Sequence, residues 1–258
     1  MTRTALAGSI LLLFALPASG VAQTLPGPER YHLRVEYREW RPSLDGQIQK
    51  GFGEAEGTRL DLMTNLGVQN KRTYDVDATL KFSQGFKLRG SITPLDYKGD
   101  TTTQFTFSFG DTTYSRGTRV ATTIKGHYYT GAFEWDFVKR PEGFFGVFLG
   151  AKVFDVDAVV LDTDQSQRVV QTGRLPIPVL GIAGRYYVGH LSLEGEFSGL
   201  TIGDRGQLWE LDTSARYHLS DRLAVQGGYR RISLEGKDQR DLVSFRIGGW
   251  TFGVELSL

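Results

Sequence analysis

The chain has 258 residues, with 30 Lys and Arg against 29 Asp and Glu and a formal net charge of +1 at pH 7. This balance excludes the basic surplus that a nucleic-acid-binding protein needs to neutralise phosphates, and it does not favour charge-driven disorder. Glycine is abundant at 32 residues, and so are two aromatic strand formers, with 16 phenylalanines and 11 tyrosines. The composition therefore favours one large β-structure.

The N-terminal segment has the pattern of a cleaved secretory signal. Arg3 is followed by an uncharged run over residues 5–16 and by small residues that predict cleavage after Ala22. The run is shorter than the roughly 20 residues of a membrane-spanning helix. The chain contains no cysteine, so attachment of lipid to a cysteine and disulfides are both excluded. We predict a signal peptide over 1–22 and a single mature domain over 23–258.

The mature domain alternates apolar and polar residues in segment after segment, for example over 73–83, 190–202 and 208–219. Alternation with a period of two predicts β-strands that have one apolar and one polar face. Twelve strands are predicted, and ten or fourteen remain compatible because 41–70 and 99–117 divide ambiguously. The predicted strands are 29–40, 56–64, 73–83, 86–97, 103–109, 118–138, 144–160, 174–188, 190–202, 208–219, 222–235 and 241–258.

Three features favour a membrane barrel with its apolar face turned to lipid over a soluble sandwich. The polar faces carry many charges of both signs, and the strands approach the 9–11 residues of a tilted membrane span. Aromatic side chains also gather near strand ends, where a bilayer interface holds them. These aromatic residues are Tyr31, Trp40, Tyr97, Trp135, Phe137, Tyr186, Tyr187 and Tyr217.

The C-terminal segment is the most specific signal in the sequence. It places Trp250, Phe252, Val254, Leu256 and Leu258 at alternate positions up to the last residue. This resembles the terminal strand of bacterial outer-membrane β-barrel proteins, although those strands usually end in Phe or Trp.

The resemblance implies an all-β protein with a single antiparallel transmembrane barrel in the outer membrane. It also implies contact with outer-membrane lipid and lipopolysaccharide, and engagement of the barrel-assembly machinery through 241–258. No oligomeric state is predicted.

Charged residues on neighbouring predicted strands in the C-terminal half of the chain are expected to face the lumen and to form ion pairs. They are Arg185, Glu194, Glu196, Glu210, Asp212, Arg216 and Arg246. A barrel of about 12 strands lies in size between 8-strand barrels, which side chains fill, and 16-strand porins, which enclose an aqueous channel. We therefore predict a narrow channel or conduit for small solutes or apolar molecules. The alternative is a non-conducting structural or surface-binding barrel with binding loops near 41–55 and 161–173.

Signs of catalysis are few. The four histidines have no metal-ligand spacing, and no nucleophile-elbow, phosphate-loop or dinucleotide motif occurs. His190 and Ser192 resemble the His-x-Ser pair of outer-membrane lipid A deacylases, which implies a hydrolase as a third reading. However, Ser192 shares its strand face with Glu194, assigned to the lumen, and His190 falls at a periplasmic turn. We therefore predict no enzyme activity and no catalytic, cofactor-binding or metal-binding residue.

Overall fold

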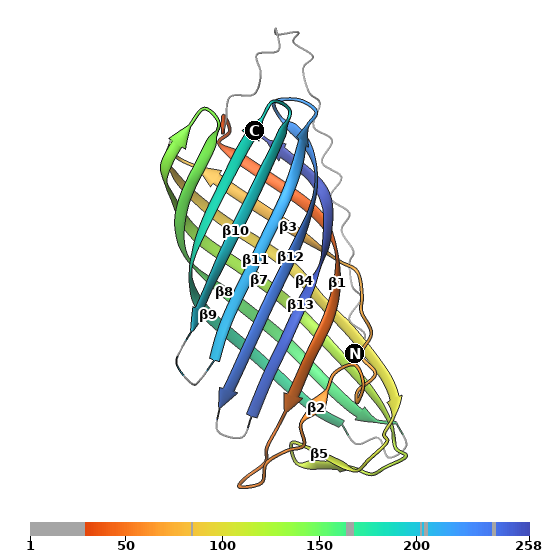
Figure 1. Ribbon diagram of the computed structural model, residues 1–258. Coiled ribbons are helices and arrows are strands. Elements are labelled where there is room, and N and C mark those ends of the chain that lie inside the picture. Colours follow the sequence, from red (N-terminus) through yellow and green to blue (C-terminus); the bar gives the residue numbers. More distant parts are fainter. Residues whose placement is uncertain (1–28, 84, 164–167, 202, 204–205, 239–240) are drawn as a thin grey trace, which may run out of the picture.

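The computed structural model describes residues 29–83, 85–163, 168–201, 203, 206–238 and 241–258, so the predicted signal peptide lies outside the described residues. Ten long antiparallel strands close into a barrel (Figure 1), because β13 pairs with β12 on one side and with β1 on the other. The barrel strands are β1 (Leu33–Gln49), β3 (Thr73–Lys81), β4 (Phe86–Thr102), β7 (Arg119–Arg140), β8 (Gly143–Asp162), β9 (Arg168–Val188), β10 (Leu191–Thr201), β11 (Gly206–His218), β12 (Leu223–Asp238) and β13 (Asp241–Ser257).

Ten barrel strands rather than twelve follow from two predicted strands that do not enter the wall. The segment 56–64 contains only the two-residue β2 (Leu60–Asp61), which pairs with the end of β1. The segment 103–109 contributes β5 (Phe107–Phe109), which forms a hairpin with β6 (Thr112–Tyr114). Both segments lie beyond the same end of the barrel (Figure 1), and we call residues 50–72 and 103–118 the cap.

With these two strands removed from the count, the predicted orientation of the strands in the N-terminal half of the chain is also corrected. Each connection at the end opposite the cap is short, including 82–85 between β3 and β4, and the C-terminus lies at that end (Figure 1). Short turns are periplasmic in bacterial barrels. The connection between β3 and β4, which a twelve-strand count directed outward, therefore lies at the end that corresponds to the periplasmic end of bacterial barrels. The predicted binding loops also shrink, because 41–49 belongs to β1 and 168–173 belongs to β9.

The outer wall carries an apolar belt around its periplasmic half. On β13 the outward side chains Trp250, Phe252 and Val254 are 62, 51 and 44% exposed, as lipid-facing residues must be in a single chain. Nearer the cap the outward residues become charged, as at Lys125 and Arg231. Because β7 has 22 residues, about twice the 9–11 that span a bilayer, the barrel extends beyond the membrane on the cap side.

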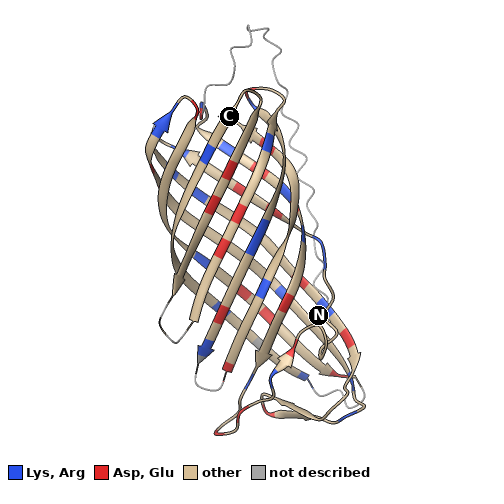
Figure 2. Ribbon diagram, in the orientation of Figure 1, with Lys and Arg blue, Asp and Glu red and all other residues tan. Residues whose placement is uncertain are grey.

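The inward side chains change in the opposite sense along the barrel, from charged in the periplasmic half to apolar in the cap half. In the periplasmic half they are charged, and we call this region the charged lumen; Figure 2 shows acidic and basic residues distributed along its strands. In the cap half the inward residues are apolar and pack with the cap into one cluster, which we call the apolar core. It includes Trp40 and Tyr97, two aromatics that the sequence placed at the bilayer interface and that are instead buried inside the barrel.

Candidate functional site

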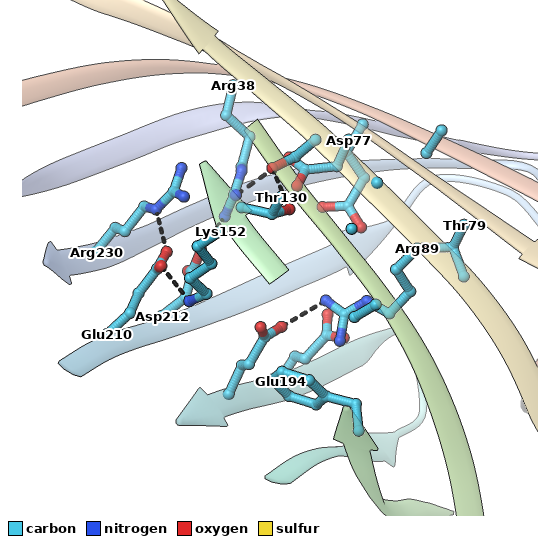
Figure 3. Close-up of a pocket in the computed structure, with 18 of the residues that line it drawn as sticks. Arg38, Asp77, Thr79, Arg89, Thr130, Lys152, Glu194, Glu210, Asp212 and Arg230 are labelled. Carbon is cyan, nitrogen blue, oxygen red and sulfur yellow. Dashed lines mark hydrogen bonds and ion pairs between the residues drawn. The ribbon is translucent and has the colours of Figure 1, made fainter. Parts of the chain in front are cut away.

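The middle of the charged lumen is organised around the buried carboxylate of Glu210 on β11. It accepts hydrogen bonds from Nε of Arg230 at 2.7 Å and from the hydroxyl of Tyr128 at 2.5 Å, and it pairs with Lys152. These partners come from β12, β7 and β8, so the interactions reach across the lumen (Figure 3). A carboxylate removed from water stays ionised only when charged and polar donors surround it, as these two cations and one hydroxyl do.

A second set of pairs joins β1 and β3 to the opposite wall. Arg38 on β1 donates to Asp212 on β11 at 2.7 Å and to Asp77 on β3 at 3.2 Å, and it also pairs with Asp75. Arg230 donates to the same Asp75 at 2.8 Å, which links this set to Glu210. The two arginines therefore tie four strands together in the centre of the barrel.

Nearer the periplasm, two arginines share three carboxylates. Arg185 on β9 donates to Glu194 at 2.7 Å and to Glu255 at 2.8 Å. Arg216 on β11 lies 2.9 Å from Glu255 and donates to Glu36 on β1 at 2.9 Å. Each arginine is only 3% exposed, so its charge is balanced by these neighbours rather than by water.

Glu29 closes this network at the periplasmic mouth, just before β1. Its carboxylate lies 2.9 Å from Nζ of Lys87 and 3.1 Å from Nζ of Lys81, although the backbone of Glu29 has a positive φ of 63°. Burial by itself would raise the pKa of Glu29, but the nearby charges of Lys87, Arg34 and Lys81 outweigh burial and hold that pKa below its ordinary value. This residue therefore stays ionised inside the barrel end.

The charged lumen leaves little empty space. The cavity among Arg38, Arg89, Glu196 and Glu210 has a volume of about 60 Å³ (Figure 3). It has room for a few waters, each of which needs roughly 10–15 Å³ measured in this way. A second cavity of about 220 Å³ lies at the periplasmic mouth beside Tyr31 and Tyr187. The cavity in the middle of the charged lumen is therefore the smaller of the two and is of water size.

The structure confirms the inward direction of six of the seven predicted lumen charges. Arg185, Glu194, Glu196, Glu210, Asp212 and Arg216 all face the charged lumen. Arg246 does not, because its side chain is 56% exposed on the outer wall and lies 3.8 Å from Glu235. The sequence analysis missed Arg38, Lys152 and Arg230, although alternating charges such as Arg34, Glu36 and Arg38 in β1 are a readable signal for lumen residues.

His190 and Ser192 do not form a pair. Ser192 is buried and shares a 2.9 Å hydrogen bond with Nε2 of His218, whereas His190 is exposed at the periplasmic turn with its ring 6.1 Å from that of Tyr217. Ser192 is 1% exposed, and its partner His218 lines the cavity at the periplasmic mouth. Within the described ranges, no group of three or more acidic or histidine side chains is placed to hold a metal ion.

Comparison with known proteins identifies the fold. No protein-family model matches the chain, and no curated protein is detectably similar to it. Among solved structures, the outer membrane protease OmpT from Escherichia coli matches with a TM-score of 0.56 at 10% identity, over 88% of this chain and 96% of that chain. The chain has the fold of a bacterial outer-membrane β-barrel.

Two further outer-membrane barrels match less closely in shape. Neisserial surface protein A matches with a TM-score of 0.36 at 12% identity, over 88% of this chain and 97% of that chain. The toluene transporter TodX of Pseudomonas putida matches with a TM-score of 0.35 at 5% identity, over 88% and 90%. Together with the apolar belt, the barrel fold places the protein in the outer membrane.

The match to OmpT also corrects one expectation. The sequence analysis predicted that the protein is not an enzyme. That prediction is wrong as an inference from a barrel fold, because OmpT, which has the same fold, is an outer membrane protease. A barrel wall fixes the backbone and leaves the loops and inward positions free to carry many chemistries.

Proposed function

We propose that this outer-membrane barrel is closed to the passage of solutes along its axis and presents the cap at the cell surface as a rigid recognition surface. The cap rests on the apolar core, which contains Leu60, Leu66 and Phe107 from the cap and Leu208 from the wall, each no more than 2% exposed. Loops anchored in this way keep a fixed shape, and a fixed shape lowers the entropy lost when a partner binds.

The observation that carries the proposal is the pairing of charges across the charged lumen. A conducting pore of this size needs water-filled space along its axis, with charges directed at a permeating ion. Here Arg38, Arg230 and Lys152 are directed at carboxylates from other strands, and all three are buried. On the cap side of these charges the apolar core forms a second barrier, which hydrated ions cross only at a high cost in free energy.

Swelling of liposomes that contain the purified protein tests this proposal. Wild-type protein should give no swelling in small sugars above that of empty liposomes. Removal of cap residues 104–117 should also give none, because the charged lumen remains intact. The double substitution Glu210→Ala and Arg230→Ala keeps the net charge and removes the central pair. Combined with the removal of residues 104–117, it should admit small sugars. Sugar-dependent swelling by the wild type contradicts a closed barrel.

We also propose that β13 engages the barrel-assembly machinery and that the apolar belt contacts outer-membrane lipid and lipopolysaccharide. Phe252 is 51% exposed on the outer wall and Leu258 follows the last strand residue. Phe252→Asp combined with Leu258→Asp should leave export intact and prevent membrane insertion. Wild-type amounts of folded barrel in outer-membrane fractions of the double variant would exclude this role.

A further inference from the structure

The strand β9 has two neighbours in its periplasmic half and only one in its cap half. Its ladder with β8 is continuous from Tyr186 to Arg168. Its ladder with β10 ends at Leu180, which lies opposite Gly199. Within the described ranges, the residues of β9 before Leu180 pair with no strand on the β10 side. We call this side of residues 168–174 the β9 edge.

Two prolines explain why β10 stops there. The backbone N–H of Tyr187 donates to the carbonyl of Glu142, on the β8 side, at 2.7 Å. Because the backbone groups of successive residues alternate between the two sides of a strand, odd-numbered residues of β9 face β8 and even-numbered residues face the β10 side. Pro176 and Pro178 therefore lack their N–H on the β10 side, and an open edge tolerates proline. They end the ladder with β10 and leave the ladder with β8 intact.

Beyond the prolines the β9 edge regains its hydrogen-bond donors. The same alternation directs the N–H and C=O groups of the even-numbered residues toward the open side. These residues are Arg168, Val170, Thr172 and Arg174. In the part of the chain that the structure describes, their backbone groups have no hydrogen-bond partner on this side. An exposed row of unpaired backbone groups is a template on which another chain adds a strand.

The two faces of this part of β9 differ in chemistry. The outward residues change from Leu180, 62% exposed in the apolar belt, to the exposed Arg174 and Arg168, so the β9 edge lies outside the membrane at the cap end (Figure 1). Facing inward, Leu175 lies opposite Phe154 of the apolar core and is nevertheless 47% exposed. A strand added at the β9 edge therefore meets basic side chains on its outer face and an apolar surface on its inner face.

We propose that the β9 edge binds one extended segment of a partner protein as an added antiparallel strand, with acidic side chains beside Arg168 and Arg174 and apolar side chains beside Leu175. In such a complex the backbone bonds supply affinity and the alternate side chains supply specificity. A second copy of this chain is the poorer occupant, because full overlap of two β9 edges puts Arg168 opposite Arg174, and like charges directly opposite destabilise a strand pair. The inference goes beyond the closed-barrel proposal, and neither swelling nor conductance depends on it.

Amide hydrogen exchange, followed by NMR on the protein in lipid nanodiscs, tests the open edge. In the free protein the amides of Val170 and Thr172 should exchange at least about tenfold faster than those of Val169 and Gly173, which donate toward β8. Equal rates for the two sets would overturn the open edge. A seven-residue peptide that alternates glutamate and valine should then slow exchange at Val170 and Thr172, and no change at these amides under saturating peptide would overturn strand addition.

Two substitutions at Thr172 isolate the backbone contribution. Thr172→Pro removes one N–H from the β9 edge and leaves the ladder with β8 intact, as Pro176 does, whereas Thr172→Ala keeps the N–H. Binding of the fluorescein-labelled glutamate–valine peptide is measured by fluorescence anisotropy. Thr172→Pro should weaken binding about tenfold, because it removes a donor and blocks its neighbours, and Thr172→Ala should bind like the wild type. Equal binding by the two variants, or no saturable binding to the wild type, would overturn the proposal.

Charge reversal tests the chemistry of the partner without altering any backbone group. Arg168→Glu combined with Arg174→Glu should weaken binding of the glutamate–valine peptide and strengthen binding of a lysine–valine peptide, each at least about fivefold. Unchanged preference between the two peptides would overturn the acidic partner. Light scattering identifies the remaining occupant: the wild type should be monomeric in detergent, and dimers that Thr172→Pro dissociates would assign the β9 edge to a second copy and overturn a foreign strand.

Discussion

Replacing Glu210 by glutamine should destabilise the barrel more than any change to an exposed ion pair. The substitution keeps the size of the side chain and removes the negative charge on which three buried donors converge, from Arg230, Lys152 and Tyr128. Breaking a buried pair from one side costs roughly 3–5 kcal/mol, because the remaining charge is left uncompensated.

The structure sets the expected value at the lower end of this range. Arg230 keeps Asp75 at 2.8 Å, and Lys152 keeps the hydroxyl of Ser198 at 2.6 Å, so neither cation loses its last partner. In the opposite sense, the new amide directs an N–H₂ group at one of these cations, which keeps the cost from falling below this range. We therefore expect a loss of about 3 kcal/mol in the free energy of unfolding.

Urea unfolding of the barrel in phospholipid vesicles, followed by tryptophan fluorescence, measures this loss. The matched control is Glu39→Gln on the outer wall, where an exposed carboxylate accepts from Arg41 at 2.7 Å. This control should leave the unfolding midpoint unchanged, since exposed pairs contribute little. If Glu210→Gln unfolds at the same urea concentration as Glu39→Gln, the charged lumen does not stabilise the barrel and the reasoning fails.

Three further outcomes are expected in the same unfolding assay. Leu193 is 60% exposed in the apolar belt, so Leu193→Arg should cost about 2–4 kcal/mol, and a stable variant would mean that this face does not contact lipid. Gly126→Ala puts a Cβ 2.0 Å from the carbonyl oxygen of Asp155 and should cost about 1–3 kcal/mol, whereas Gly131→Ala, with nothing within 4 Å, should be neutral. Glu29→Gln should cost about 2 kcal/mol at pH 7. Because the pKa of Glu29 is lowered in the folded state, its contribution is present above the unfolded pKa of about 4.3 and is lost as pH falls through the folded-state value, so wild type and variant should converge in acid.

The barrel class and most of its wall could be predicted from the sequence, because alternation reports which side chains share a strand face. The terminal strand shows this best, since Trp250, Phe252 and Val254 are all exposed on the outer wall. The number of strands in the wall was harder to predict from the sequence. Residues 56–64 alternate like a wall strand, yet only Leu60 and Asp61 pair, because alternation does not reveal whether a segment has two neighbours.

The apolar core was missed although the sequence contains a signal for it. Every second residue of β12 faces inward, and these residues are Arg230, then Ile232 and Leu234. The inward positions are therefore charged in the membrane and apolar nearer the cap. On β1 the same change occurs between Arg38 and Trp40. On the same part of β12 the outward residue Arg231 is charged and exposed, so lipid does not contact the outer wall at this level. Long-range pairs such as Arg38 with Asp212 depend on barrel closure and have no local signature.

Single-channel recording in planar lipid bilayers tests the central claim most directly, since one open barrel is detectable among many closed ones. With charges paired across the charged lumen and the apolar core above it, wild-type protein should give no conductance steps at moderate voltage in molar salt. The variant combining Glu210→Ala and Arg230→Ala with removal of cap residues 104–117 should give small steps under the same conditions. Regular, long-lived steps from the wild type, unchanged in that variant, would contradict a barrel closed by its buried ion pairs and its apolar core.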